Sequence, residues 1–128
     1  DVQVNCTSDN NTIRKDPTLW DVYASAMVTA PTGDPQYFFT SCALDESVSN
    51  NGHYHSDKLE ELAAEIETEF DVDKRAELGI QMQQTVLDDH AFVFCSFLKM
   101  SMISKANVTG YESHACDYYQ VTADLDIN

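Results

Sequence analysis

The pattern of apolar and polar positions predicts two amphipathic helices in the middle of the chain. After Ser56, a favourable N-cap residue, apolar side chains recur every three or four residues with acidic residues between them, as on one buried helix face. The same spacing predicts a second helix from Asp73 to Asp88, whose Arg75 is expected to pair with a nearby acid. The buried rows comprise Leu59, Leu62, Ala63, Ile66 and Phe70 in the first helix and Leu78, Met82 and Val86 in the second.

Segments rich in β-branched and aromatic residues predict strands on both sides of these helices. Val2 to Cys6 is a short apolar run, and Ala91 to Leu98 is another that is too short for a typical buried helix. Trp20 to Ala30 stays largely uncharged, as expected of a strand with little solvent contact. A last strand is predicted at Tyr119 to Ala123. The chain is therefore expected to combine strands with helices.

The end of the strand at Trp20 to Ala30 is the first candidate site. Pro31-Thr32-Gly33 breaks the strand, and Asp34 is placed to cap a helix whose first residue is Pro35. Open α/β sheets usually bind ligands where a strand stops at a loop and a helix begins. The same local layout also occurs in α/β proteins with many other functions. The candidate ligand-binding residues are Thr29, Thr32, Gly33 and Asp34.

Two histidines in a polar loop form the second candidate site. His53 and His55 are two residues apart, so an extended backbone would direct both imidazoles to one side, where they could chelate nickel or zinc. Histidines in a polar loop beside a helix N-cap usually serve as exposed hydrogen-bonding residues. We favour that interpretation and keep the metal site as the alternative.

Composition and charge exclude several classes of function. The chain has 128 residues and is 43% apolar, which suits one folded domain. Its 22 acidic and seven basic residues give a net charge of −15, which repels phosphate backbones, so we expect no nucleic-acid partner. No run approaches the roughly 20 apolar residues of a membrane span, so no membrane insertion is expected. Because HExxH, GxSxG, GxGxxG and Walker A patterns are missing, we expect neither an enzyme nor a cofactor.

The four cysteines are too far apart in the sequence for a CxxC redox or zinc site. In an exported protein they could form two disulfides, with three connectivities open. Cys95 lies in the run Phe92 to Phe97 and is predicted to be a buried free thiol. Both states stay open for Cys6, Cys42 and Cys116.

A series of short motifs follows the predicted elements in order. The motifs are Trp20-Asp21-Val22-Tyr23, Asp34-Pro35, Ser49 to Ser56, Asp73 to Leu78, Leu87 to Ala91 and Val108 to Glu112. From about Trp20 to Leu125, this order resembles the carboxyl-terminal portion of the extracytoplasmic solute-binding proteins of peptide and nickel ABC importers. The resemblance implies an α/β lobe of the periplasmic binding protein-like type II fold, with a mixed sheet flanked by helices. Because the family's chains are several times longer, residues 1–128 are expected to be a single domain and a fragment of a two-lobed protein.

The resemblance also implies a non-catalytic function. Members of this family capture a peptide, nickel or a nickel chelate between their lobes and deliver it to permease subunits in the membrane. They act outside the cytoplasm, in the periplasm or anchored by lipid at the bacterial cell surface. Pro31 stands where oligopeptide-binding members carry an acidic residue, and Val28 to Pro35 is closer to nickel-binding members. The alternative from another class is a self-contained acidic protein-interaction module with no transport role.

Overall fold

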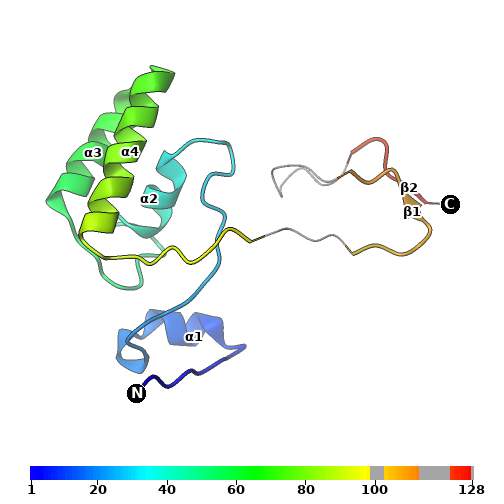
Figure 1. Cartoon of the computed structure of the whole chain (residues 1–128), viewed down its shortest axis with the longest axis horizontal. Helices are drawn as coiled ribbons and strands as arrows, with labels where there is room; N and C mark the ends of the chain where they lie inside the picture. Colours follow the sequence, from blue (N-terminus) through cyan, green and yellow to red (C-terminus); the bar gives the residue numbers. More distant parts are fainter. Residues whose placement is uncertain (99–102, 113–121, 128) are drawn as a thin grey trace.

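The computed structural model describes residues 1–98, 103–112 and 122–127 of the chain. Helices dominate these residues, and two short strands lie near the carboxyl terminus (Figure 1). The structure therefore fits the α/β expectation only in its broadest sense, as helices accompanied by a small sheet. In chain order the elements are α1 (Asn10–Lys15), the 3-10 helix η1 (Pro17–Leu19), α2 (Gln36–Cys42), α3 (Asp57–Thr68), α4 (Val72–Asp88), β1 (Val108–Thr109) and β2 (Asp126–Ile127).

Helices α2, α3 and α4 pack together and contain the hydrophobic core (Figure 1). The linker of residues 69–71 joins α3 to α4, which lie side by side. The two helices predicted from the sequence are confirmed, because their apolar rows face this core. Leu59, Ile66 and Met82 are completely buried, with exposed fractions of 0%. The core comprises Phe39, Ala43, Leu59, Leu62, Ala63, Ile66, Leu78, Met82 and Val86.

The ends of these helices differ slightly from the predicted ones. Ser56 occupies the N-cap position of α3, although its side chain makes no capping hydrogen bond. The prediction that Phe70 is buried was wrong, because α3 ends at Thr68 and Phe70 lies in the linker with 89% of its surface exposed. Helix α4 begins at Val72, because the carboxylate of Asp71 accepts a hydrogen bond from the Lys74 amide.

The predicted strands are the main error of the sequence analysis. Residues 2–6, 20–30 and 91–98 contain no strand, and many of their apolar side chains are exposed, including Val4 (79%) and Phe97 (100%). A strand needs a neighbour for its backbone hydrogen bonds, and none of the residues that the structure describes supplies one to these segments. Of the strand predicted at Tyr119 to Ala123, residues 119–121 lie outside the described residues and the last two are not in a strand.

The sheet that is observed is a short antiparallel pair. Strand β1 pairs with β2, so that Val108 faces Ile127 and Thr109 faces Asp126. This pair lies beyond the extended segment that follows α4, away from the three packed helices (Figure 1). The start of that segment still contacts the core, because the ring of Phe92 packs edge-on against Phe38.

The described cysteines are free thiols, and they divide by burial. Cys42 is buried in α2, whereas Cys6 and Cys95 are exposed. The prediction for Cys95 was thus wrong on burial, because the segment around it is not covered by a sheet. Cys116 lies outside the described residues. Among the helices that the structure describes, none is long and apolar enough to cross a membrane.

Candidate functional site

The turn from Thr29 to Asp34 leads the extended segment of residues 20–30 into α2. Its bend is closed by a hydrogen bond of 3.0 Å from the Gly33 amide to the Ala30 carbonyl oxygen. Gly33 has a φ angle of +80°, a left-handed conformation that glycine adopts without a steric penalty. Thr29, Thr32 and Gly33 are exposed at the surface of this turn.

Asp34 fixes the end of this turn through both of its carboxylate oxygens. Oδ1 accepts a hydrogen bond of 2.8 Å from the Gln36 amide. The predicted helix start was one residue early, because α2 begins at Gln36 and its N-cap position is occupied by Pro35 rather than by Asp34. Oδ2 forms an ion pair with Arg75 Nη2 at 2.6 Å. Burial raises the pKa of Asp34, but the hydrogen bonds from Gln36 and Arg75 outweigh it, so that the pKa lies below the usual 3.8. The carboxylate is therefore ionised at neutral pH, and each of its two oxygens has a partner.

Arg75 joins three helices through one guanidinium group. It extends from α4, binds Asp34 before α2, and donates to the Gln36 side-chain oxygen at 3.2 Å. Its Nη1 donates to the carbonyl oxygens of Ile66 at 2.5 Å and Glu69 at 2.8 Å, which would otherwise be unsatisfied at the end of α3. The Arg75 side chain is only 19% exposed. The predicted pairing of Arg75 with an acid is confirmed, and the pair anchors the turn to the helical core.

Gly79 lets the turn approach α4 closely. It lies one helical turn after Arg75, and a Cβ atom at this position would be 2.8 Å from the Pro35 Cβ atom. Such a distance is too short for two carbon atoms, so only glycine fits without movement of the backbone. Gly79 was not predicted as a site residue from the sequence. The signal that could have identified it is a glycine inside a helical pattern, which often marks a close packing contact.

The predicted site residues differ in how far the fold already uses them. Asp34 is occupied by its two partners, whereas Thr29, Thr32 and Gly33 are exposed. The hydroxyl and backbone groups of these three residues are neutral and can donate or accept hydrogen bonds. The structure therefore separates the four predicted site residues into one that holds the turn and three that are available to a ligand.

The two histidines are exposed, in agreement with the favoured interpretation. His53 has a φ angle of +51°, a left-handed conformation, so the alternative of a pair in a fully extended segment does not hold at this residue. His55 binds Asp45 through Nδ1 at 2.9 Å and Asp57 through Nε2 at 3.3 Å. The hydrogen bond and negative charge of Asp45, with a smaller contribution from Asp57, raise the pKa of His55 above its usual 6.5. Nowhere in the described ranges do three His, Cys, Asp or Glu side chains converge as a metal site would require.

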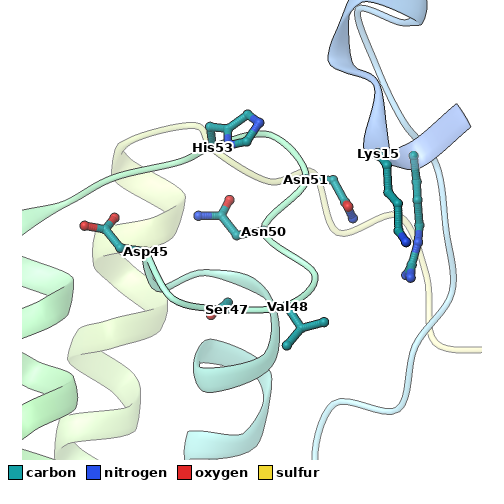
Figure 2. Close-up of a pocket in the computed structure, with 8 residues that line it drawn as sticks. Lys15, Asp45, Ser47, Val48, Asn50, Asn51 and His53 are labelled. Carbon is teal, nitrogen blue, oxygen red and sulfur yellow. The ribbon is translucent and has the colours of Figure 1, made fainter. Parts of the chain in front are cut away.

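A surface hollow of about 270 Å³ lies between α1 and the loop of residues 45–53, and the sequence analysis did not predict it (Figure 2). Lys15 approaches from α1, whereas Asp45 and His53 lie on the opposite side of the loop (Figure 2). The only sequence signal was the adjacent basic pair Arg14-Lys15 in a strongly acidic chain. The lining residues are Arg14, Lys15, Asp45, Ser47, Val48, Asn50, Asn51 and His53.

Comparisons with known proteins found no matching family model, no matching curated protein and no matching solved structure. The argument for function thus depends on the residues and geometry of this chain.

Proposed function

We propose that this chain is part of one lobe of an extracytoplasmic solute-binding protein that serves an ABC importer. The observation that carries the proposal is the exposed turn from Thr29 to Asp34, which the Asp34–Arg75 ion pair fixes to three packed helices. In the proposed protein, the solute lies between this turn and a second lobe. The closed form then delivers the solute to permease subunits in the membrane.

The rigidity of the turn supports a role in binding. Binding residues commonly lie on loops that a rigid scaffold positions, because a preformed site loses less conformational entropy when the ligand arrives. Here Arg75 and the contact of Pro35 with Gly79 hold one end of the turn, while Thr29 and Thr32 stay exposed at the other.

The exposed apolar segments support a larger lobe. Residues 20–30 and 91–98 carry side chains such as Val22, Val93 and Phe97, which are 86%, 86% and 100% exposed. β-Prone segments with unpaired backbone groups are normally covered or paired in a native protein. We therefore include in the proposal the mixed sheet flanked by helices, of the periplasmic binding protein-like type II fold, in which these segments would be strands.

The available groups favour a peptide or a metal chelate over a bare nickel ion. A bare ion needs several protein ligands, and no such cluster occurs in the described part of the chain. A peptide or a chelate brings its own polar groups, which can hydrogen-bond to the hydroxyls of Thr29 and Thr32 and to the backbone at Gly33. The proposed protein is non-catalytic and acts in the periplasm or at the bacterial cell surface.

The test is calorimetry on the complete polypeptide that the gene encodes, with short peptides, nickel and nickel–histidine as ligands. Thr32→Trp and Thr29→Trp should each abolish binding, because a bulky side chain would fill the proposed cleft. Ala64→Trp is the matched control, since Ala64 is exposed on α3 and lies outside the turn. Binding that persists in both folded Thr variants would refute the site, whereas loss in all three variants would indicate a general effect on folding.

The second candidate function is a self-contained acidic protein-interaction module. The observation in its favour is the extended segment after α4, in which Phe94, Phe97 and Leu98 are exposed by 58%, 100% and 72%. Such a segment can pair with the edge of a partner's sheet. A short autonomous gene would support this function, whereas a longer reading frame beside permease and ATPase genes would support the transport protein.

A further inference from the structure

We propose that the hollow between α1 and the loop of residues 45–53 binds a small anion with several oxygen atoms, such as a phosphate or a dicarboxylate. This site is separate from the proposed solute site, because none of its lining residues belongs to the turn from Thr29 to Asp34. The inference therefore does not depend on the transport function.

The size of the hollow suits a small molecule. Its volume of about 270 Å³ is just below the range of roughly 300–1,000 Å³ that is usual for ligand sites. At about 30 Å³ for each water molecule, it holds on the order of nine waters. Phosphate and short dicarboxylates fall within this size.

Two basic residues at the hollow have no acidic partner among the residues that the structure describes. Across residues 1–98, 103–112 and 122–127, the ion pairs are made by Lys74, Arg75 and His55, and neither Arg14 nor Lys15 takes part in one. The Nε atom of Arg14 is buried and forms no hydrogen bond. A buried donor without a partner is unfavourable, but this atom is covered by protein. An anion in the hollow would therefore bind the terminal nitrogens of the Arg14 guanidinium and the Lys15 ammonium. The dipole of α1 favours basic residues in its last turn, but it does not account for the burial of this atom.

The loop that forms the other wall is held by its own hydrogen bonds. Asn50 donates to the carbonyl oxygens of Leu44 and Tyr54 and accepts from the Tyr54 amide. Ser47 donates to the carbonyl oxygens of Phe39 and Thr40. These polar side chains therefore shape the wall, whereas the basic residues across from it remain available to a ligand.

The acidic charge of the chain does not prevent anion binding at this position. Asp45 is the acidic residue among those that line the hollow, and its two oxygens lie 2.9 and 3.0 Å from His55 Nδ1, so that the protonated form of His55 offsets its charge. More distant carboxylates are screened, because the Debye length is about 8 Å at physiological ionic strength. An arginine can bind two anionic oxygens at once, and a nearby lysine adds a point charge.

The experiment titrates the full chain with inorganic phosphate and, separately, with succinate, using NMR amide shifts at constant ionic strength set with sodium chloride. We expect saturable binding with a Kd below about 1 mM and shifts centred on residues 14–15 and 47–53. Arg14→Gln and Lys15→Gln should each weaken binding at least about tenfold, the loss expected for one charge-assisted hydrogen bond. Lys58→Gln removes the same charge from an exposed position on α3 and should leave the Kd unchanged.

The results separate the possible ligands and can overturn the proposal. Binding of phosphate alone indicates a phosphate ligand, binding of succinate alone indicates a carboxylate ligand, and binding of both indicates a general oxyanion site. No saturable binding of either anion, or equal weakening by Lys58→Gln, would overturn the proposal. If Arg14→Gln does not fold, Lys15→Gln still decides the outcome, because Lys15 is exposed.

Discussion

The three packed helices and the extended segments around them place their apolar residues in opposite environments, although the extended segments are the richer in such residues. Met82 and Val86 in α4 are completely buried, whereas Val22 and Val93 in the extended segments are each 86% exposed. A helix forms its backbone hydrogen bonds within itself, so it needs a neighbour only for its apolar face. A strand needs a neighbour for its backbone as well. The difference shows that apolar spacing along a helix identifies a buried face, whereas an apolar, β-prone run does not by itself bring the partner that a strand needs.

The largest effect should come from removing a core side chain of the helical unit. Met82→Ala is expected to lower the free energy of unfolding by about 2–5 kcal/mol, because Met82 is fully buried and its removal leaves a cavity. Ile80→Ala on the same helix should change it by less than about 0.5 kcal/mol, since Ile80 is 65% exposed. Urea denaturation measures the free energy of unfolding of both variants. Similar losses of unfolding free energy in the two variants would contradict the burial of Met82 in the core.

A smaller loss is expected when the link between the turn and the helices is broken. Arg75→Gln should destabilise the protein by about 2 kcal/mol, because Asp34 and two carbonyl oxygens at the end of α3 lose their charged donor. Lys74→Gln is the control, and its exposed pair with Glu69 should be worth less than about 0.5 kcal/mol. A double-mutant cycle with Asp34→Asn should give a clear coupling energy for Asp34–Arg75, and additive effects would contradict the link.

Gly79→Ala should destabilise the protein by about 1 kcal/mol, although alanine is the better helix former. The added Cβ atom would lie 2.8 Å from Pro35, and the rigid proline ring cannot move aside as a flexible side chain can. This clash is expected to outweigh the gain of about 1 kcal/mol in helix propensity. A Cβ atom added at Gly52 would meet no other atom within 4 Å, so Gly52→Ala should leave the midpoint of thermal unfolding nearly unchanged. A stabilised Gly79→Ala protein would show that the turn does not pack closely on α4.

The smallest effect concerns the dependence of stability on pH. Because the pKa of Asp34 is lowered in the folded state, the unfolded chain binds more protons at acidic pH, and the free energy of unfolding rises with pH there. The stabilisation is present above the unfolded pKa of about 3.9 and is lost as the pH falls through the folded pKa. Asp34→Asn should reduce the slope of the free energy of unfolding against pH in this acidic range. Glu61→Gln, at an exposed position on α3, should leave this slope unchanged. Equal slopes for wild type and Asp34→Asn would contradict the assignment.

The helices could be predicted from the sequence because their causes are local. Apolar spacing identified the buried faces of α3 and α4. The Asp-Pro pair after a glycine turn located the start of α2 to within one residue. Phe70 followed the same spacing but lies outside the helix, since the pattern does not mark where α3 ends.

The contacts between distant parts of the chain could not be predicted in the same way. Arg75 was expected to find an acid, but its choice of Asp34, 41 residues away, depends on how α2 packs against α4. The hollow beside α1 likewise depends on the placement of two segments that are distant in sequence. The strands were predicted from β-prone composition alone, which gives no partner for their backbone hydrogen bonds.

In the proposed function this chain contributes one side of a solute cleft, and a paired calorimetric titration decides whether it does. Short peptides, nickel and nickel–histidine are titrated into the 128-residue chain and into the complete polypeptide that its gene encodes. The account predicts no measurable binding to the 128-residue chain, because one side of a cleft supplies only part of the contacts, and clear binding of one solute to the complete polypeptide. Binding to the 128-residue chain tighter than about 1 μM, or no binding to either protein, would contradict it.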